Sequence, residues 1–181
     1  VALSGDGPRG NASVKSLGGL STVALGGSIA RGVVLGGTIS SSGGTAEFKG
    51  GPYENRTIVL DDRTVAASSK ADAAFSQLGL FVDWFPDPVG GWHVGASASL
   101  GMISLLNRAD DNNKNALFGS SLSGSLSGGY DWSIGKAWSL GLSLVASGMK
   151  STSLKYMDDG SESGYKLRSA SVGIQCSVLY F

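Results

Sequence analysis

The chain has 181 residues, a formal net charge of zero, 29 glycines and only 15% charged residues, a size that fits a single domain. The balanced charge and the lack of a basic stripe argue against nucleic-acid binding. The single cysteine, Cys176, excludes an intramolecular disulfide and a zinc site built from clustered cysteines. No segment approaches the roughly 20 consecutive apolar residues of a transmembrane helix, and the recurring apolar pattern argues against disorder.

Apolar residues alternate with glycine, serine and other small polar residues along most of the chain, a period of two that is typical of strands. In 92–102 every even position is apolar and every odd position is His, Gly or Ser. A helix is disfavoured there because each glycine costs about 1 kcal/mol relative to alanine. The alternation predicts strands near 17–29, 33–41, 75–85, 92–105, 117–132, 138–150 and 166–181.

Short and long connections alternate between these strands. Short turns are expected at 30–32, 86–91 and 133–137, and long polar loops near 42–74, 106–116 and 151–165. This alternation predicts hairpins whose turns lie at one end and whose loops lie at the other, as in outer-membrane barrels. We therefore predict that 1–181 form one domain, an all-β antiparallel transmembrane up-and-down barrel of about eight strands.

Seven complete strands leave the barrel one strand short, because bacterial barrels usually have an even number. Residues 1–3 are expected to be the tail of a first strand, followed by a loop at 5–8. We expect the rest of this strand to lie upstream of residue 1 or to be unrepresented.

Aromatic residues gather beside the short turns. Because Trp and Tyr prefer the membrane interface, these residues predict an aromatic girdle at the turn end. The alternative is a soluble barrel or sandwich with aromatics filling its end, but that fold would place Gly and Ser outside, where charges are usual. The girdle residues are Trp84, Trp92, Tyr130, Trp132, Trp138 and Tyr180.

Several segments carry a family resemblance: 24–37, 81–88, 90–94, 128–131, 138–141 and 177–181. In them the chain resembles small bacterial outer-membrane barrels of the OmpX, OmpA-transmembrane-domain and OmpW kind, and more closely the glycine-rich barrels predicted in myxobacteria and related groups. The resemblance implies a bacterial outer-membrane location, contact with membrane lipid and lipopolysaccharide, and insertion by the barrel-assembly machinery. It implies no agreed activity. The terminal signal departs from the usual pattern, since the outward set ends at Tyr180 rather than Phe181.

The candidate chemistry lies in an interior polar cluster of Asp83, His93 and Asp131. Pairing Trp84 with Trp92 would place Asp83 opposite the only histidine, with Asp131 at a similar level. Such a group could be catalytic or proton-linked, or it could satisfy itself and fix the strand register. We favour the structural role and predict no enzyme, cofactor or metal site, because no nucleophile motif or calcium-loop spacing is present.

Four cations lie at the loop-side ends of the predicted strands: Lys15, Lys150, Lys166 and Arg168. They could bind lipopolysaccharide phosphates or simply be hydrated, with their stems along the apolar wall. Within the first long loop, 57–60 and 63–65 predict a small hairpin that could offer an edge to another envelope protein or a neighbouring copy.

Three functions follow from these predictions. A structural or interaction barrel that presents its loops is the first, a narrow porin-like conduit for small solutes is the alternative, and a lipid-modifying barrel enzyme is a distant third.

Overall fold

The structure is a computed structural model, and it describes residues 2–6, 12–49, 58–60, 63–65, 70–87, 91–107, 116–134, 138–157, 160–163 and 166–180. Within these ranges the chain is all β. No helix there has the length and apolar character needed to cross a membrane.

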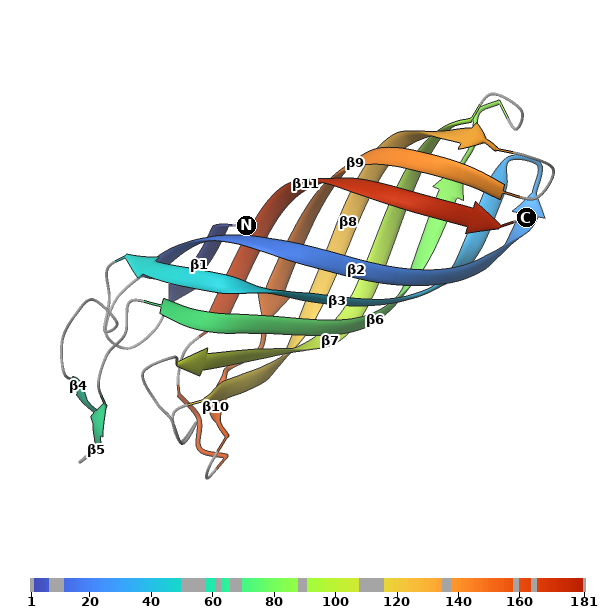
Figure 1. The fold of residues 1–181 in the computed structure, drawn as a ribbon. Helices are drawn as coiled ribbons and strands as arrows, with labels where there is room; N and C mark the ends of the chain where they lie inside the picture. The colour runs from blue at the N-terminus through green and yellow to red at the C-terminus, as the bar shows by residue number, and fades with distance from the viewer. Residues whose placement is uncertain are drawn as a thin grey trace.

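Eight antiparallel strands, connected up and down, form one sheet (Figure 1). In spatial order they run β8-β7-β6-β3-β2-β1-β11-β9, and β8 also pairs with β9 along a ladder from Ser121↔Ser151 to Ser133↔Ser139. The strands are β1 (Ala2–Asp6), β2 (Ala12–Ala30), β3 (Val33–Lys49), β6 (Lys70–Trp84), β7 (Trp92–Asn107), β8 (Leu117–Ser133), β9 (Trp138–Ser151) and β11 (Lys166–Tyr180). A short strand, β10 (Lys155–Tyr156), also pairs with β8 in this sheet. Two further short strands, β4 (Ile58–Leu60) and β5 (Arg63–Val65), form a separate two-stranded sheet.

All seven complete strands predicted from the alternation are present, so this part of the prediction is confirmed. The small hairpin is confirmed as well, since β4 pairs with β5 from Ile58↔Val65 to Leu60↔Arg63. The expected bounds of the first long loop, 42–74, are wrong. The ladder of β3 with β6 continues to Glu47↔Lys70. The residues beyond the apolar alternation are polar, but strands pair through their backbones, so the polar side chains do not end the ladder.

The short first strand predicted at the N-terminus is present as β1, but it continues to Asp6, so the expectation that the loop begins at Gly5 was wrong. It pairs with β11 from Ala2↔Ala170 to Asp6↔Lys166, and with β2 from Ala2↔Lys15 to Gly5↔Ala12. The strand therefore lies between β2 and β11 in the sheet, at the end where the long loops lie (Figure 1).

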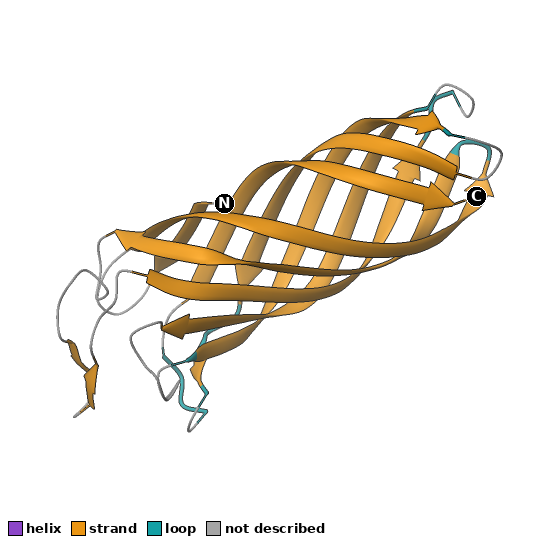
Figure 2. Cartoon of the chain, viewed as in Figure 1, coloured by secondary structure: helices purple, strands orange, loops and turns teal. Residues whose placement is uncertain are grey.

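Short turns join the strands at the opposite end, which we call the turn end (Figure 2). Gly32 and Gly91 have φ values of 72° and 77°, a left-handed conformation that favours glycine. Backbone hydrogen bonds link these turns to neighbouring strands: Phe85 N donates to Gly32 O at 2.7 Å, and Asp131 N donates to Gly91 O at 2.9 Å. The turn end is thus tied together by backbone hydrogen bonds.

Side chains alternate between an exposed outward face and a more buried inward face. In β9 the even positions from Trp138 to Leu144 are exposed, whereas Ser139, Gly141 and Ser143 are buried. The outward face therefore carries the large apolar residues and the inward face carries mostly serine and glycine.

The buried apolar core lies at the loop end of the sheet. It consists of Ala73, Ile103, Leu105, Leu117, Leu154 and Leu167, with Phe75, Met149 and Tyr156 packed against it. Leu154 is only 1% exposed, although it belongs to the connection between β9 and β11. That connection, predicted only as a polar outer loop, therefore folds inward through one leucine.

Candidate functional site

The polar cluster near the turn end is built from four neighbouring strands. His93 of β7 places its Nδ1 3.6 Å from Asp83 Oδ1 on β6 and its Nε2 4.0 Å from Asp131 Oδ2 on β8. Its Nε2 also lies 3.2 Å from the hydroxyl of Ser143 on β9. The imidazole is thus surrounded by two carboxylates and a serine.

The contact between Asp83 and His93 arises from a register that differs from the one expected. Trp84 pairs with Val94 rather than with Trp92, so Asp83 lies opposite Gly95 and diagonal to His93. Phe85 fits the inward space beside the imidazole, and the two rings stack at a centroid distance of 5.3 Å. The expected pairing of Trp84 with Trp92 was therefore wrong by two residues, although the two polar side chains still meet.

Glycines give the polar side chains their space, and sequence reasoning missed them. Asp83 is register-paired with Gly95, His93 with Gly129, and Asp131 with Gly141. A Cβ on Gly129 would approach His93 Nε2 to 2.8 Å and overlap the Ser143 hydroxyl; one on Gly95 or Gly141 would overlap the carboxylate beside it. Each polar side chain therefore lies over a glycine of the next strand.

Sequence reasoning also missed Ser143, because it is one of many serines at inward positions. Ser143 lies directly opposite Gly129, and Gly129 lies directly opposite His93. This relation could have identified Ser143 only if the register of all three strands had been known. Ser143 is 7% exposed.

Ser143, His93 and Asp83 are arranged like the nucleophile, base and acid of a catalytic triad. The Ser143 hydroxyl contacts His93 Nε2, and the Asp83 carboxylate lies near His93 Nδ1. Two features disfavour nucleophilic chemistry here. Ser143 is buried, and the Asp131 carboxylate lies on its side of the imidazole, where a developing oxyanion would be repelled rather than stabilised. Among the described residues, no group of three or more His, Cys, Asp or Glu side chains is arranged so that it could hold a metal ion.

Three buried polar atoms of the cluster have no hydrogen-bond partner in the described part of the chain. They are the Nδ1 atom of His93 and the two carboxylate oxygens of Asp131. Because unpaired buried polar groups are costly, the His–Asp attraction is the main compensation that the described residues supply. The geometry therefore indicates an electrostatic network that ties β6, β7, β8 and β9 together.

Above the cluster, the inward face is a column of serines with few large side chains. Ser97 and Ser125 hydroxyls lie 2.7 Å apart, and the Ser123 hydroxyl donates to Gln77 Oε1 at 2.8 Å. The column ends at the apolar core of the loop end. Side chains thus cover both ends of the inward face of the sheet, with apolar residues at the loop end and the His93 cluster at the turn end.

The aromatic residues lie on the outward face at the turn end. Trp84, Trp92, Trp132 and Trp138 are each at least half exposed, whereas the Tyr180 side chain lies outside what is described. The Tyr130 ring contacts Trp92 and Trp132, with centroid distances of 5.2 and 5.1 Å.

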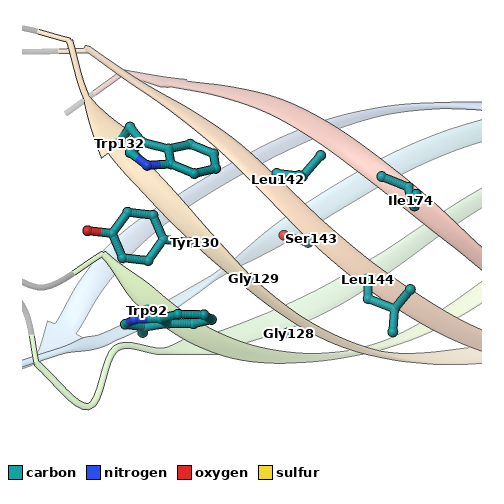
Figure 3. Close-up of a pocket in the computed structure, with 9 residues that line it drawn as sticks. All are labelled: Trp92, Gly128, Gly129, Tyr130, Trp132, Leu142, Ser143, Leu144 and Ile174. Atoms are coloured by element: carbon teal, nitrogen blue, oxygen red, sulfur yellow. The ribbon is translucent and has the colours of Figure 1, made fainter.

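Beside these rings is an open groove of about 540 Å³ above Gly128, walled by Trp92, Tyr130, Trp132, Leu142, Leu144 and Ile174 (Figure 3). Its lining is almost entirely apolar, so it suits hydrocarbon rather than a polar substrate.

The loop-side cations fall into two groups by register. Arg168 is paired directly with Lys150, and both are exposed. Lys166 is paired with Asp6, and Lys15 with Glu47; the Lys15 side chain lies outside the described residues. No protein-family model matches the chain, and no curated protein matches it, so the resemblance to OmpX-like barrels stays a prediction.

Proposed function

We propose that this protein is a transmembrane β-barrel of the bacterial outer membrane, which anchors in the bilayer and presents its loop end to an envelope partner or to lipopolysaccharide. The observation that carries this proposal is the exposed apolar outward face. Leu25 is 80% exposed, Ile174 77% and Leu100 68%, and they lie on three different strands. Proteins in water rarely expose contiguous apolar surface beyond a few hundred Å², whereas lipid covers such a surface at no cost.

Closure of the sheet is part of this proposal and is supported by the ladder between β8 and β9. Since β8 also pairs with β7 and β9 with β11, these pairings join the two ends of the strand order. A barrel leaves no strand edge in lipid, where an unpaired backbone group costs several kcal/mol.

Strand length supports an extension of the wall beyond the bilayer. A tilted strand needs about 9–11 residues to cross the hydrocarbon core, whereas β8 has 17 residues and β9 has 14. The aromatic girdle at the turn end places one interface there, so the surplus extends from the loop end.

The turn end is assigned to the periplasm, because short periplasmic turns and long outer loops are the rule for such barrels. Arg31 and Asp87 are exposed at this end; Lys136 lies outside the described residues. The loop end, with its β4–β5 hairpin, is the surface offered to a partner. The His93 cluster has a structural role in this proposal.

Cysteine labelling of whole cells with a membrane-impermeant maleimide tests the topology. The parent is Cys176→Ser, because Cys176 is exposed and would react when the protein is in detergent. In this parent, Asp159→Cys is expected to label in intact cells and Lys136→Cys only after permeabilisation. Labelling of Lys136→Cys alone in intact cells would contradict the proposed orientation, and a protein absent from the outer-membrane fraction would contradict the proposal itself.

A further inference from the structure

Several charged residues near the loop end of the strands are register-paired with residues of opposite charge. Lys15 is register-paired with Glu47, and Glu47 in turn with Lys70. On the other side of the sheet, Lys166 is paired with Asp6. Opposite charges in directly paired positions stabilise a sheet, and like charges there destabilise it.

Lys150 and Arg168 break this pattern. They are directly opposite each other on β9 and β11, and both are exposed. Their other paired neighbours are Leu122 for Lys150 and Ser4 for Arg168, so no acidic residue shares their row. In the described part of the chain, no ion pair involves either side chain.

The surface next to this pair is unusually flat and apolar. One step toward the turn end, Gly148 is paired with Ala170 on one side and with Gly124 on the other, and all three are exposed. Larger apolar side chains rise on both sides of this row: Leu122 and Leu126 on β8 and Val172 on β11 are 60%, 67% and 73% exposed. A hydrocarbon chain can therefore lie against the glycines directly below the two cations.

We propose that Lys150 and Arg168 form a binding site for the phosphate group of a membrane lipid, whose acyl chain packs over Gly148, Ala170 and Gly124. Directly paired residues have Cβ atoms about 5 Å apart, so the guanidinium and the ammonium can bind oxygens of one phosphate. Arg binds phosphate with two parallel hydrogen bonds and Lys as a point charge. A phosphate without a lipid would leave the apolar bed uncovered, so the occupant is the phosphorylated lipid. This inference rests on the proposed membrane location.

Native mass spectrometry of the full chain in a neutral detergent tests the site, with diphosphorylated lipid A as the probe. The double variant Lys150→Gln/Arg168→Gln is expected to bind lipid A at least about tenfold more weakly than the parent. The matched control is Lys166→Gln on the same face, where Asp6 is the register partner; its binding is expected to stay within about twofold of the parent. Equal lipid A binding by the double variant and the parent would overturn the proposal, as would displacement of lipid A by an equal concentration of inorganic phosphate.

A second variant keeps the test valid if the double variant folds poorly. Lys150→Glu places an acid opposite Arg168, so the unfolding midpoint in lipid-free micelles is expected to rise while lipid A binding falls by the same tenfold or more. If Lys150 had only a structural role, the unfolding midpoint and the lipid A binding would change in the same direction. Insertion of the parent protein into neutral phosphatidylcholine vesicles is measured first. Failure of the parent to insert would contradict the membrane proposal. Normal insertion of the parent, together with lipid A binding that is unchanged in the variants, would overturn only the lipid site.

Discussion

Glycines at inward positions make room for the polar side chains that lie beside them. Asp83, His93 and Asp131 each occupy the space above the glycine that is register-paired with them on the next strand. Glycine weakens a strand interior, but here the absent Cβ lets a carboxylate or imidazole lie flat against the wall. The result is that charged groups of β6, β7 and β8 approach one another within 4.0 Å.

His93→Gln is expected to lower the free energy of unfolding by about 1–3 kcal/mol, because it removes the group that lies between the buried carboxylate of Asp131 and the partly buried carboxylate of Asp83. Urea titration of the protein in micelles measures this change. Adding Asp131→Asn to His93→Gln is expected to recover part of the loss, since it removes one of the two carboxylates left facing each other. Unchanged stability of His93→Gln would contradict the network, and loss of a lipid-hydrolysing activity in this variant would assign His93 to catalysis.

At the scale of elements, β3 and β6 form a wall that does not depend on the connection between them. Their ladder runs from Val33↔Trp84 to Glu47↔Lys70, and among the described residues β4 and β5 pair only with each other. We therefore expect changes in the connection to leave the ladder in place, which makes the connection a candidate for the proposed recognition. Long connections of this kind are commonly functional.

Replacing 48–69 by Asn-Gly is expected to leave the protein folded, with an unchanged unfolding midpoint in micelles, because Glu47 and Lys70 are directly paired and two residues of this type close a hairpin. Capture of an envelope partner from cell extract is expected to be lost. The matched control replaces only 58–65 by a Gly-Ser linker of equal length, which removes the hairpin and keeps the connection. Capture of the same partner by the Asn-Gly variant would place recognition elsewhere.

At the scale of the whole molecule, the inward face of the sheet differs between its two ends. Leu154 and Ile103 are almost fully buried at the loop end, and the His93 cluster fills the turn end. Interiors of eight-stranded barrels are just wide enough to be filled by side chains. These features favour an anchor that presents loops over a conduit, although the serine column between the ends is polar.

Planar-bilayer recordings are therefore expected to detect no stable channel openings for the parent protein. The double variant Leu154→Gly/His93→Gly removes one side chain at the loop end and one at the turn end. It is expected to increase the ionic conductance of the bilayer and therefore serves as the positive control. Regular single-channel steps from the parent would contradict the filled interior and favour the conduit.

The strand order and the two faces could be predicted from the sequence, because alternation and turn residues act locally. Trp92 to Met102 alternate with small residues whatever lies beside them, and a six-residue turn rich in Pro and Gly at 86–91 reverses the chain wherever it occurs. For the same reason the outward position of Leu78 or Ile174 was predictable. The extensions of β2 to Ala12, of β3 to Lys49 and of β6 to Lys70 were not predicted, since no side-chain pattern marks where backbone pairing stops.

The tertiary structure decided which residues meet across strands. A shift of two residues between β6 and β7 keeps every side chain on its face, so the alternation cannot distinguish Trp84↔Val94 from Trp84↔Trp92. The same freedom hid the contact of Ser143 with His93, the glycine beneath each polar side chain and the pairing of Lys150 with Arg168. These contacts depend on the relative shift of strands that are distant in sequence, and turns, packing and charge determine that shift together.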